Sequence, residues 1–375
     1  MQHALLLAVL TALPPLSVQQ GAKDKRKPGQ IDPPTQIKVD EAIKRGVDYL
    51  LKIKASKMDE LVLWTLLQSA IVPRTDPVIQ DLVQAMVDAP LERTYRVSLQ
   101  AMIFEELDRI GYQWRIRQCA QFLADNQCVN GAWNYGEPSP FADAVPTGDK
   151  AKKESPKAAN GKTESKAVTK VTVIKKRDGP KGGDNSNSQY AALGLRACHN
   201  AGIVFEKKLI ELARTHWRND QDADGAWFYG SNRDLTGSMT AGGVGAMVIY
   251  DHILGESWKK DKAALNGLDW LGKNFSVKEN PGCPRKSAID NEAQDGHLTY
   301  FYYMYALERA GILFGTEVLG TREWYPEGVN VLLGAQKPDG SWRAGTIDTC
   351  FAILFLRRAT RPLTAVASVD RFKKP

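Results

Sequence analysis

Apolar residues recur along the chain at the spacing of an α-helix, in paired segments separated by polar turns that contain glycine. In the last pair, Val329, Leu332 and Leu333 share one face of the first segment, whereas the second, 350–356 (CFAILFL), is apolar all round. A helix with a single apolar face lies on the surface of a core, and one that is apolar on every side is buried. Each pair therefore predicts an outer amphipathic helix followed by an inner buried helix.

About six such pairs follow one another along residues 37–362. A fixed repeat of helix pairs is typical of arrays and rings. The first alternative is an open solenoid, whose terminal repeats need polar caps. The last inner segment, 350–356, has no polar face, so we favour closure. The predicted fold is all-α: an α/α toroid in which inner helices form a barrel around a central cavity and outer helices surround it.

A seven-residue turn with the pattern Gln-x-x-x-Gly-x-Trp occurs three times, at the end of three predicted outer helices. Glycine permits a positive φ where a helix stops, and the indole can fold back onto the neighbouring pair. The glutamine amide can satisfy main-chain groups at nearby helix ends. We expect a structural role for all nine residues: Gln127, Gly131 and Trp133; Gln221, Gly225 and Trp227; Gln336, Gly340 and Trp342.

The two ends of the chain and one internal segment differ in composition from the repeats. Residues 1–22 contain an apolar run of about 15 residues, typical of a signal peptide, so export to the periplasm or the extracellular space is expected. Residues 23–36 are a predicted linker, 142–184 a basic disordered insertion without aromatic residues, and 363–375 a tail. No later segment has the ~20 apolar residues that a membrane span requires.

The net charge of +7 is located in these added segments and not in the repeats. Residues 142–184 carry a surplus of five positive charges, 23–27 a surplus of three and 370–374 a surplus of two, which leaves the rest of the chain at about −3. A nucleic-acid partner would require a basic surface on the folded body. We therefore expect no nucleic-acid partner. The five cysteines form no CxxC pair. Two alternatives remain for them: one disulfide, or free thiols buried in the core.

The repeated turn resembles the QW motif of squalene and oxidosqualene cyclases and the related repeat of protein prenyltransferase β subunits. Over 299–311 and 324–359 the chain is similar to exported, single-toroid prenyltransferase/squalene oxidase repeat proteins of planctomycete-like bacteria. The resemblance covers about 38–360. It implies an α/α toroid with two six-helix rings and a central cavity for an isoprenoid chain. It implies no reaction, because that exported group has no assigned activity.

The resemblance directs attention to two kinds of catalytic site. Squalene-hopene cyclases protonate an alkene with a D-x-D-D acid, and this chain has no such sequence; Asp220, Asp222 and Asp224 fall in an outer turn and are expected to be solvated there. Prenyltransferase β subunits bind zinc through Asp-x-Cys and a later His. Asp348 and Cys350 match the first part, but no histidine follows them.

His297 could complete a zinc site if the ring brings the starts of the inner helices together. The alternative is that Asp348 caps its helix and Cys350 belongs to the core. We expect no cofactor, with zinc at Asp348, Cys350 and His297 as the alternative. Asp295 and His297 are the only pair that suggests acid–base chemistry.

The remaining candidates lie at the predicted starts and inner faces of the inner helices. The starts gather polar residues into a rim: Asp59, Glu60, Tyr95, Arg96, Asn187, Gln189, Thr240 and Tyr300. Five aromatic residues are candidates for lining the cavity: Trp64, Phe301, Tyr302, Tyr303 and Phe351.

Three hypotheses for function follow from these candidates. The first is a cyclase-like toroid that binds an isoprenoid or other apolar small molecule. The second is a non-catalytic exported scaffold for a protein partner. The third is a carbohydrate-active barrel, which would require paired carboxylates from Asp59, Asp295 and Asp348.

Overall fold

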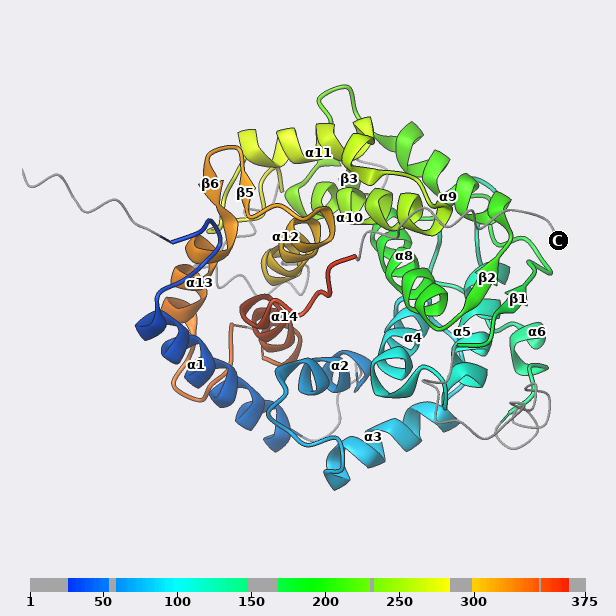
Figure 1. Cartoon of the computed structure of the whole chain (residues 1–375), viewed down its shortest axis with the longest axis horizontal. Coiled ribbons are helices and arrows are strands. Elements are labelled where there is room, and N and C mark those ends of the chain that lie inside the picture. Colours follow the sequence, from blue (N-terminus) through cyan, green and yellow to red (C-terminus); the bar gives the residue numbers. More distant parts are fainter. Residues whose placement is uncertain are drawn as a thin grey trace, which may run out of the picture.

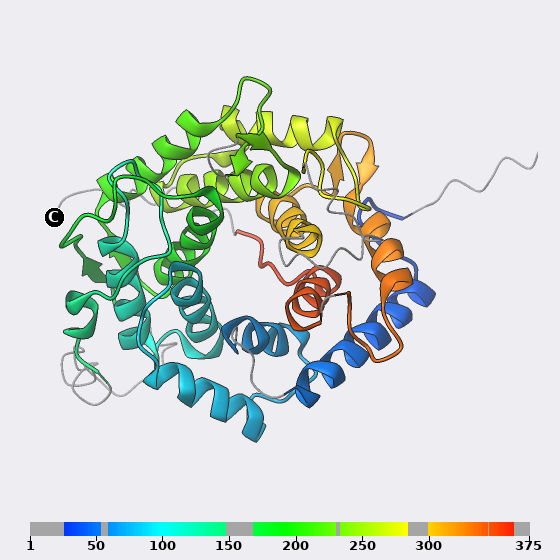
Figure 2. The same cartoon turned by 180° about the vertical axis from the view of Figure 1, so that it is seen from behind.

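The computed structural model describes residues 26–53, 59–147, 168–229, 233–283, 299–343 and 345–363. Long helices alternate between two concentric rings (Figures 1 and 2). The outer ring consists of α1 (Pro33–Lys52), α3 (Pro77–Asp88), α5 (Gln113–Asp125), α9 (Lys207–Asp220), α11 (Lys262–Lys273) and α13 (Trp324–Ala335). The inner ring consists of α2 (Asp59–Ser69), α4 (Thr94–Asp108), α8 (Asn185–Asn200), α10 (Gly237–Leu254), α12 (Tyr300–Phe314) and α14 (Thr346–Arg357). The predicted α/α toroid of six helix pairs is confirmed.

Short elements decorate the connections between the helices. They comprise the four-residue helix α6 (Pro140–Asp143), the 3-10 helix η1 (Trp258–Lys260) and three two-stranded sheets. The parallel pair is β1 (Val171–Val173) with β2 (Ile203–Phe205); the antiparallel pairs are β3 (Phe228–Tyr229) with β4 (Asp234–Leu235), and β5 (Val318–Leu319) with β6 (Arg322–Glu323).

The two rings bury their residues differently, as the hydrophobic pattern predicts. Nearly every residue of α10 is buried, because α8, α9, α11 and α12 all pack against it. In contrast α11 buries one face only, through residues such as Ala264, Trp270 and Leu271. An inner helix is covered by the outer ring on one side and by its inner neighbours on the other, so it needs apolar residues around its whole circumference.

The ring closes between the last and the first helix pair. α14 packs against both α1 and α2. The side chain of Gln336, at the end of α13, donates from Nε2 to the Ala42 carbonyl of α1 at 2.9 Å, and Arg357 Nε donates to the Gln68 carbonyl of α2 at 3.1 Å. An open solenoid would leave these groups apart, so that alternative is wrong.

The repeated turn connects its outer helix to the next outer helix. Each glutamine donates from Nε2 to a main-chain carbonyl of that next helix: Gln127 to Leu209 (2.8 Å), Gln221 to Ala263 (2.8 Å) and Gln336 to Ala42 (2.9 Å). Each glycine has a positive φ, of 92°, 92° and 91° at Gly131, Gly225 and Gly340. A Cβ there would lie 2.4, 2.7 and 2.3 Å from the carbonyl oxygens of Leu212, Asn266 and Arg45. Each of these positions therefore requires glycine for two reasons: the positive φ and the close approach of the neighbouring carbonyl.

The tryptophan of the turn is fully buried and fixed by two hydrogen bonds. Its Nε1 donates to the carbonyl ten residues earlier, at 2.8, 2.7 and 2.9 Å for Trp133, Trp227 and Trp342. Its main-chain N–H donates to the hydroxyl of the fourth residue of the following inner helix: Ser188, Thr240 and Thr349. The indoles of Trp227 and Trp342 lie over Gly267 and Gly46 of the next outer helix, where a Cβ would come within 2.7 and 3.0 Å.

Two predicted boundaries differ from the structure. Helix α1 begins at Pro33, inside the predicted linker 23–36, because the carboxylate of Asp32 accepts from Thr35 N at 2.7 Å and caps the helix. Within the predicted insertion 142–184, residues 142–147 and 168–184 have defined structure, and 148–167 lie outside the described residues.

The second part of that insertion is held by polar groups of the ring, which a composition argument cannot detect. Gln113 and Gln121 donate to the carbonyls of Thr169 and Ile174, and Lys176 N donates to the Asp125 carboxylate at 2.8 Å. The predicted signal peptide (1–22) lies outside the described residues, and so does all of the tail after Leu363.

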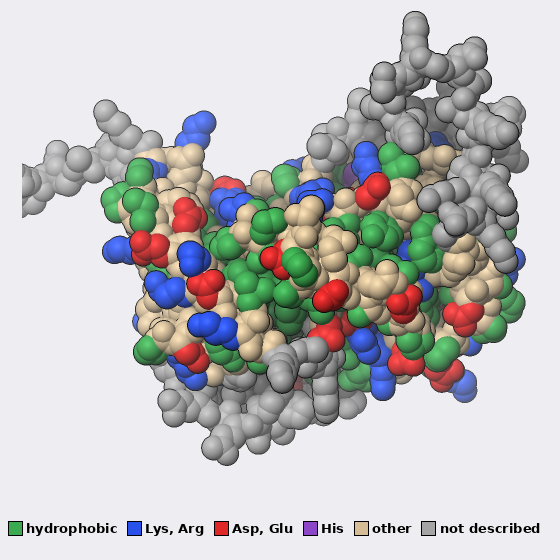
Figure 3. Space-filling model, turned by 90° about the horizontal axis from the view of Figure 1, so that it is seen from below, with side chains coloured by type: hydrophobic (Ala, Val, Ile, Leu, Met, Phe, Trp, Pro, Cys, Tyr) green, Lys and Arg blue, Asp and Glu red, His purple; other side chains and the backbone are tan. Residues whose placement is uncertain are grey.

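The surface charge, the length of the helices and the state of the cysteines complete the description of the fold. On the face drawn in Figure 3, Lys and Arg side chains alternate with Asp and Glu without a continuous patch of either sign. None of the helices in the described residues is both long and apolar enough to cross a membrane. All five cysteines are free, and four of them are buried: Cys119, Cys128, Cys198 and Cys350.

Candidate functional site

Most of the described residues of the predicted polar rim are buried and hydrogen-bonded to other parts of the ring. Glu60 is 1% exposed, and its Oε1 accepts from Arg96 Nε at 2.8 Å and from Gln100 Nε2 at 3.1 Å. Gln100 in turn contacts Arg115 of the outer helix α5. This network lies between the two rings and therefore joins helices.

Other rim residues also stabilise the starts of helices. Asn187 donates to the Asp184 carboxylate that caps α8, Thr240 binds the main chain of Trp227, and the Tyr300 hydroxyl donates to the Val277 carbonyl at 2.7 Å. Asp295 and His297, the predicted acid–base pair, lie outside the described residues.

The acidic turn after α9 has a structural role. Asp222 Oδ1 accepts from Asp224 N at 3.1 Å, and Asp222 exchanges main-chain hydrogen bonds within the turn. Asp220 contacts Asn185 of α8. These carboxylates stabilise the turn and do not reach the centre of the ring as a protonating group.

The described part of the proposed zinc site does not fit a metal centre. Cys350 is fully buried, and burial raises the pKa of its thiol to about 12, which opposes the thiolate that zinc requires. Asp348 lies in the first turn of α14 with its carboxylate 3.9 Å from Arg343 Nε, while Gly345 holds the cap position. Among the described residues no group of three His, Cys, Asp or Glu could hold a metal ion; His297 lies outside them.

The carbohydrate hypothesis depends on Asp59, Asp348 and Asp295. The first two start α2 and α14. Asp295 lies outside the described residues, so the paired carboxylates of that hypothesis stay a prediction.

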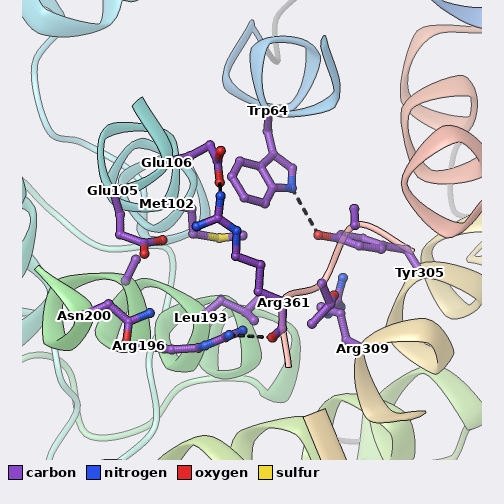
Figure 4. A pocket seen from close by; sticks show the side chains of 13 residues that line it. Trp64, Met102, Glu105, Glu106, Leu193, Arg196, Asn200, Tyr305, Arg309 and Arg361 are labelled. Atoms are coloured by element: carbon purple, nitrogen blue, oxygen red, sulfur yellow. Dashed lines mark hydrogen bonds and ion pairs between the residues drawn. The ribbon is translucent and has the colours of Figure 1, made fainter. Parts of the chain in front are cut away.

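Aromatic side chains from four inner helices meet at the centre of the ring. The Tyr302 and Tyr305 rings of α12 each lie 5.8 Å from Phe351 of α14, and Tyr302 lies 6.4 Å from Tyr190 of α8. Trp64 of α2 donates from Nε1 to the Tyr305 hydroxyl at 3.1 Å (Figure 4). We call these five residues the aromatic wall.

Three of the five predicted cavity aromatics, Trp64, Tyr302 and Phe351, belong to the aromatic wall. The other two do not. Tyr303 donates to the Ser276 carbonyl in the loop after α11, at 2.9 Å, and Phe301 is buried beside Tyr300. Neighbouring residues on a helix point in different directions, so one run of aromatics cannot all face the same cavity.

Arg309 of α12 supplies a cation to the aromatic wall. Its guanidinium carbon lies 4.1 Å from the centre of the Tyr305 ring and 5.9 Å from that of Tyr190. Its Nη2 donates to Gln189 Oε1 at 2.8 Å, and Gln189 Nε2 donates to the Tyr302 hydroxyl. The aromatic wall is therefore accompanied by a buried cation that stacks on its rings.

The segment after α14 runs across the middle of the ring next to the aromatic wall (Figures 1 and 2). We call residues 359–361 the crossing segment. Thr360 donates from its main-chain N (3.0 Å) and its hydroxyl (2.6 Å) to the two carboxylate oxygens of Glu308. The Arg361 carbonyl accepts from Arg196 Nη2 at 2.5 Å, and the Arg361 guanidinium pairs with Glu106.

A cavity of about 40 Å³ remains between the crossing segment and the inner helices. Trp64, Met102, Leu193 and Tyr305 provide its apolar lining, and its charged lining consists of Glu105, Glu106, Arg196, Arg309 and Arg361 (Figure 4). An isoprenoid chain does not fit in this volume while the crossing segment is in place.

Burial shifts the pKa values of the charged groups around this cavity. It raises the pKa of Glu308, which is fully buried, to about 7 despite the hydrogen bonds from Thr360. It also raises the pKa of Glu105 and lowers that of Arg196. In each case the charged form is destabilised by the loss of water.

Glu308 and Arg309 were not identified from the sequence as site residues, although a signal was present. They are adjacent charged residues in the otherwise apolar stretch YALERAG of an inner helix. A charge in a helix that is buried on all sides requires a partner or a ligand. Tyr190 and the crossing segment gave no comparable signal, because their role arises only from ring closure.

Comparisons with known proteins identify relatives by structure only. No protein-family profile matches the chain, and no curated protein matches it. Three solved structures of variants of MstE, a type II terpene cyclase from Scytonema, are similar over 87% of this chain and 97% of theirs. The variant bound to merosterolic acid A has a TM-score of 0.51 at 11% identity, and the one bound to geranylgeranyl dihydroxybenzoate 0.50 at 11%. The ligand-free variant has a TM-score of 0.50 at 10% sequence identity.

At 10–11% sequence identity, the similarity to these structures shows a shared fold and nothing more. The shared region covers nearly the whole of the MstE chain, so the single toroid of this protein has the same overall fold as that chain. The chain therefore has a terpenoid cyclase-like α/α toroid fold.

Proposed function

We propose that this chain binds an apolar, isoprenoid-type small molecule at the centre of its inner ring. The observation that carries the proposal is the aromatic wall, in which side chains from four inner helices meet around Arg309. Aromatic faces provide large apolar contact areas. MstE, which shares the fold, was solved with geranylgeranyl dihydroxybenzoate as its substrate and merosterolic acid A as its product.

The proposal is limited to binding and includes no protonation of an alkene. Glu308 is the fully buried carboxyl group near the aromatic wall, and its pKa of about 7 would allow it to hold a proton. Both of its oxygens, however, accept hydrogen bonds from Thr360. A general acid must present its proton to the substrate, and this geometry directs the carboxyl group towards the chain itself.

Binding requires the crossing segment to move, because the ligand needs the volume that residues 359–361 occupy. The segment is short and is held mainly by the two hydrogen bonds to Glu308 and by the contacts of Arg361 with Arg196 and Glu106. When only a small fraction of the protein is in the binding-competent state, the apparent affinity is lowered in proportion to that fraction. Weakening the segment should therefore strengthen binding.

Calorimetric titration of geranylgeraniol into the purified full chain tests the proposal. We expect saturable binding, weakened at least tenfold by Phe351→Ala, which removes one ring of the wall, and strengthened by Thr360→Val, which removes one hydrogen bond of the crossing segment. Phe104→Ala is the matched control, because Phe104 is fully buried beside Tyr112 and lies outside the aromatic wall. Absence of binding in both the native chain and Thr360→Val contradicts the proposal.

A second candidate function is that of an exported scaffold for a protein partner, with the ring as a rigid support. The observation in its favour is the crossing segment, which fills the central space with the chain itself. Native mass spectrometry distinguishes the two: a retained small molecule supports the first, and a ligand-free protein that binds no geranylgeraniol supports the second. Export belongs to both proposals, and a mature N-terminus near residue 23 would support it.

A further inference from the structure

Arg309 has a hydrogen-bonding capacity that the described residues do not use. The residue is 3% exposed, and its Nη2 donates to Gln189 Oε1 at 2.8 Å while the guanidinium stacks on Tyr305. Its Nη1 is buried and has no hydrogen-bond partner among the described residues. An unpaired N–H on a buried cation is costly, so this atom is a strong candidate for contact with a ligand.

A second guanidinium in the same cavity has a similar unused donor. Arg196 Nη2 donates to the Arg361 carbonyl, but Arg196 Nε is buried without a partner among the described residues. Both arginines line the cavity of about 40 Å³ (Figure 4). They come from different inner helices, α8 and α12, so the closed ring and not one local motif brings both residues to this cavity.

The other charges of the cavity leave room for one anion. Three arginines and two glutamates line it, a difference of one positive charge. Glu106 is already paired, with Arg74 Nη2 at 2.5 Å and with Arg361. Burial raises the pKa of Glu105 and so favours its neutral form beside an incoming anion. The lining therefore carries a net positive charge whether Glu105 is ionised or neutral, and this favours an anion.

The volume of the cavity selects the kind of anion. A cavity needs at least about 10–15 Å³ of such volume to hold one water, so about 40 Å³ admits only a small group of atoms. That is the size of a carboxylate group and much less than that of a diphosphate. The apolar lining from Trp64, Met102 and Leu193 suits a carboxylate attached to a hydrocarbon.

We propose that this cavity binds the carboxylate of an isoprenoid-type acid, with Arg309 Nη1 and Arg196 Nε as its hydrogen-bond donors. The inference rests on the proposed function, because it names the polar end of the ligand whose chain lies against the aromatic wall. A carboxylate accepts both donors and satisfies the two unpaired guanidinium groups. The ligand class is therefore an amphiphile with one carboxylate end.

Three probes test this inference at pH 7.5 with the full chain: acetate, geranylgeranoic acid and the corresponding alcohol, geranylgeraniol. Acetate fits the cavity without movement of the crossing segment, so it reports on the anion site alone. We expect geranylgeranoic acid to bind at least tenfold more tightly than geranylgeraniol, since a hydrogen bond to a charged group is worth about that factor or more. Arg309→Met should remove this difference between the acid and the alcohol and abolish acetate binding.

Arg322→Met is the matched control, because Arg322 also lies over an aromatic ring, that of Phe275 at 5.4 Å, but is exposed and paired with Glu327. It should leave all three affinities unchanged. If Arg309→Met does not fold, as judged by circular dichroism, Arg196→Met is measured in its place with the same expectation.

The outcomes separate the two proposals. Equal binding of the acid and the alcohol, without acetate binding, overturns this inference and leaves the proposed function standing. Acetate binding that depends on Arg309, without binding of either long-chain probe, supports the anion site and overturns the proposed function. No binding of any probe contradicts both.

Discussion

The repeated turns and the centre of the ring differ in what they repeat. Each turn repeats the same residues and the same contacts, with glutamine, glycine and tryptophan holding the next outer helix at equivalent carbonyls and hydroxyls. In the centre a helix position recurs but its side chain varies: Trp64, Tyr190, Tyr305 and Phe351 are each the sixth residue of an inner helix. Identical residues therefore mark what forms the ring, and the shared position with varied side chains marks what the ring could bind.

The difference also separates stability from ligand specificity. The buried indoles of the turns contribute to the folded state whether or not a ligand is present. In the centre, buried charges with unused donors lower the stability of the free protein and favour a compensating ligand. Three predictions can break or sharpen this comparison.

The largest effect is expected from Trp342→Ala in the last turn. Trp342 is fully buried, its Nε1 donates to the Leu332 carbonyl, and its ring lies over Gly46 of α1. Loss of so large a buried side chain should lower the free energy of unfolding by about 3–5 kcal/mol. Chemical denaturation measures it, with Trp258→Ala as the control, because Trp258 is partly exposed in η1. An unchanged denaturation midpoint for Trp342→Ala would show that the tryptophan of the turn does not stabilise the ring.

The centre should respond to pH through Glu308. Burial raises its pKa from 4.5 to about 7, so the folded state binds more protons than the unfolded state between these values. The free energy of unfolding should then fall as the pH rises from 4.5 to 7, by as much as about 3 kcal/mol. Below 4.5 the contribution is fully present, and above 7 it is lost.

Denaturation of the native chain and of Glu308→Gln across this pH range isolates the effect. The variant cannot titrate, so its unfolding free energy should decrease less with pH. Glu105 and Asp251, whose pKa values are also raised by burial, contribute to both proteins and cancel in the comparison. Parallel pH profiles for the two proteins would show that Glu308 is already ionised in the folded chain.

The same contrast explains what the sequence could predict. The ring, the helix pairs and the nine turn residues follow from periodicity and self-similarity, which are local signals. Phe301 and Tyr303 were expected in the cavity, but Tyr303 donates to the Ser276 carbonyl of the loop after α11 and Phe301 is buried beside Tyr300, because the orientation of a buried helix depends on its neighbours. The crossing segment could not be predicted, because its partners are distant in the sequence. Thr360 binds Glu308, which is 52 residues away, and Arg361 binds Arg196, which is 165 residues away. Ring closure brings these residues together.

The smallest expected effect distinguishes two copies of the turn from one another. Gln127→Ala and Gln336→Ala each remove a hydrogen bond to the next outer helix, Leu209 in one case and Ala42 in the other. Each should lower the free energy of unfolding by about 1–2 kcal/mol. The location of the effect should differ: Gln336→Ala opens the contact that joins the two ends of the chain, so amide hydrogen exchange should increase in α1.

Gln127→Ala should instead increase exchange at the start of α9 and leave α1 protected. Because α1 is held to the last helix pair only by noncovalent contacts with α13 and α14, whereas α9 has chain connections to both neighbouring pairs, the closing turn should show the larger local effect for the same loss of stability. Equal exchange in α1 for both variants would mean that closure is carried by the packing of α14 on α1 and α2, with the glutamine adding no more at the junction than it does elsewhere in the ring.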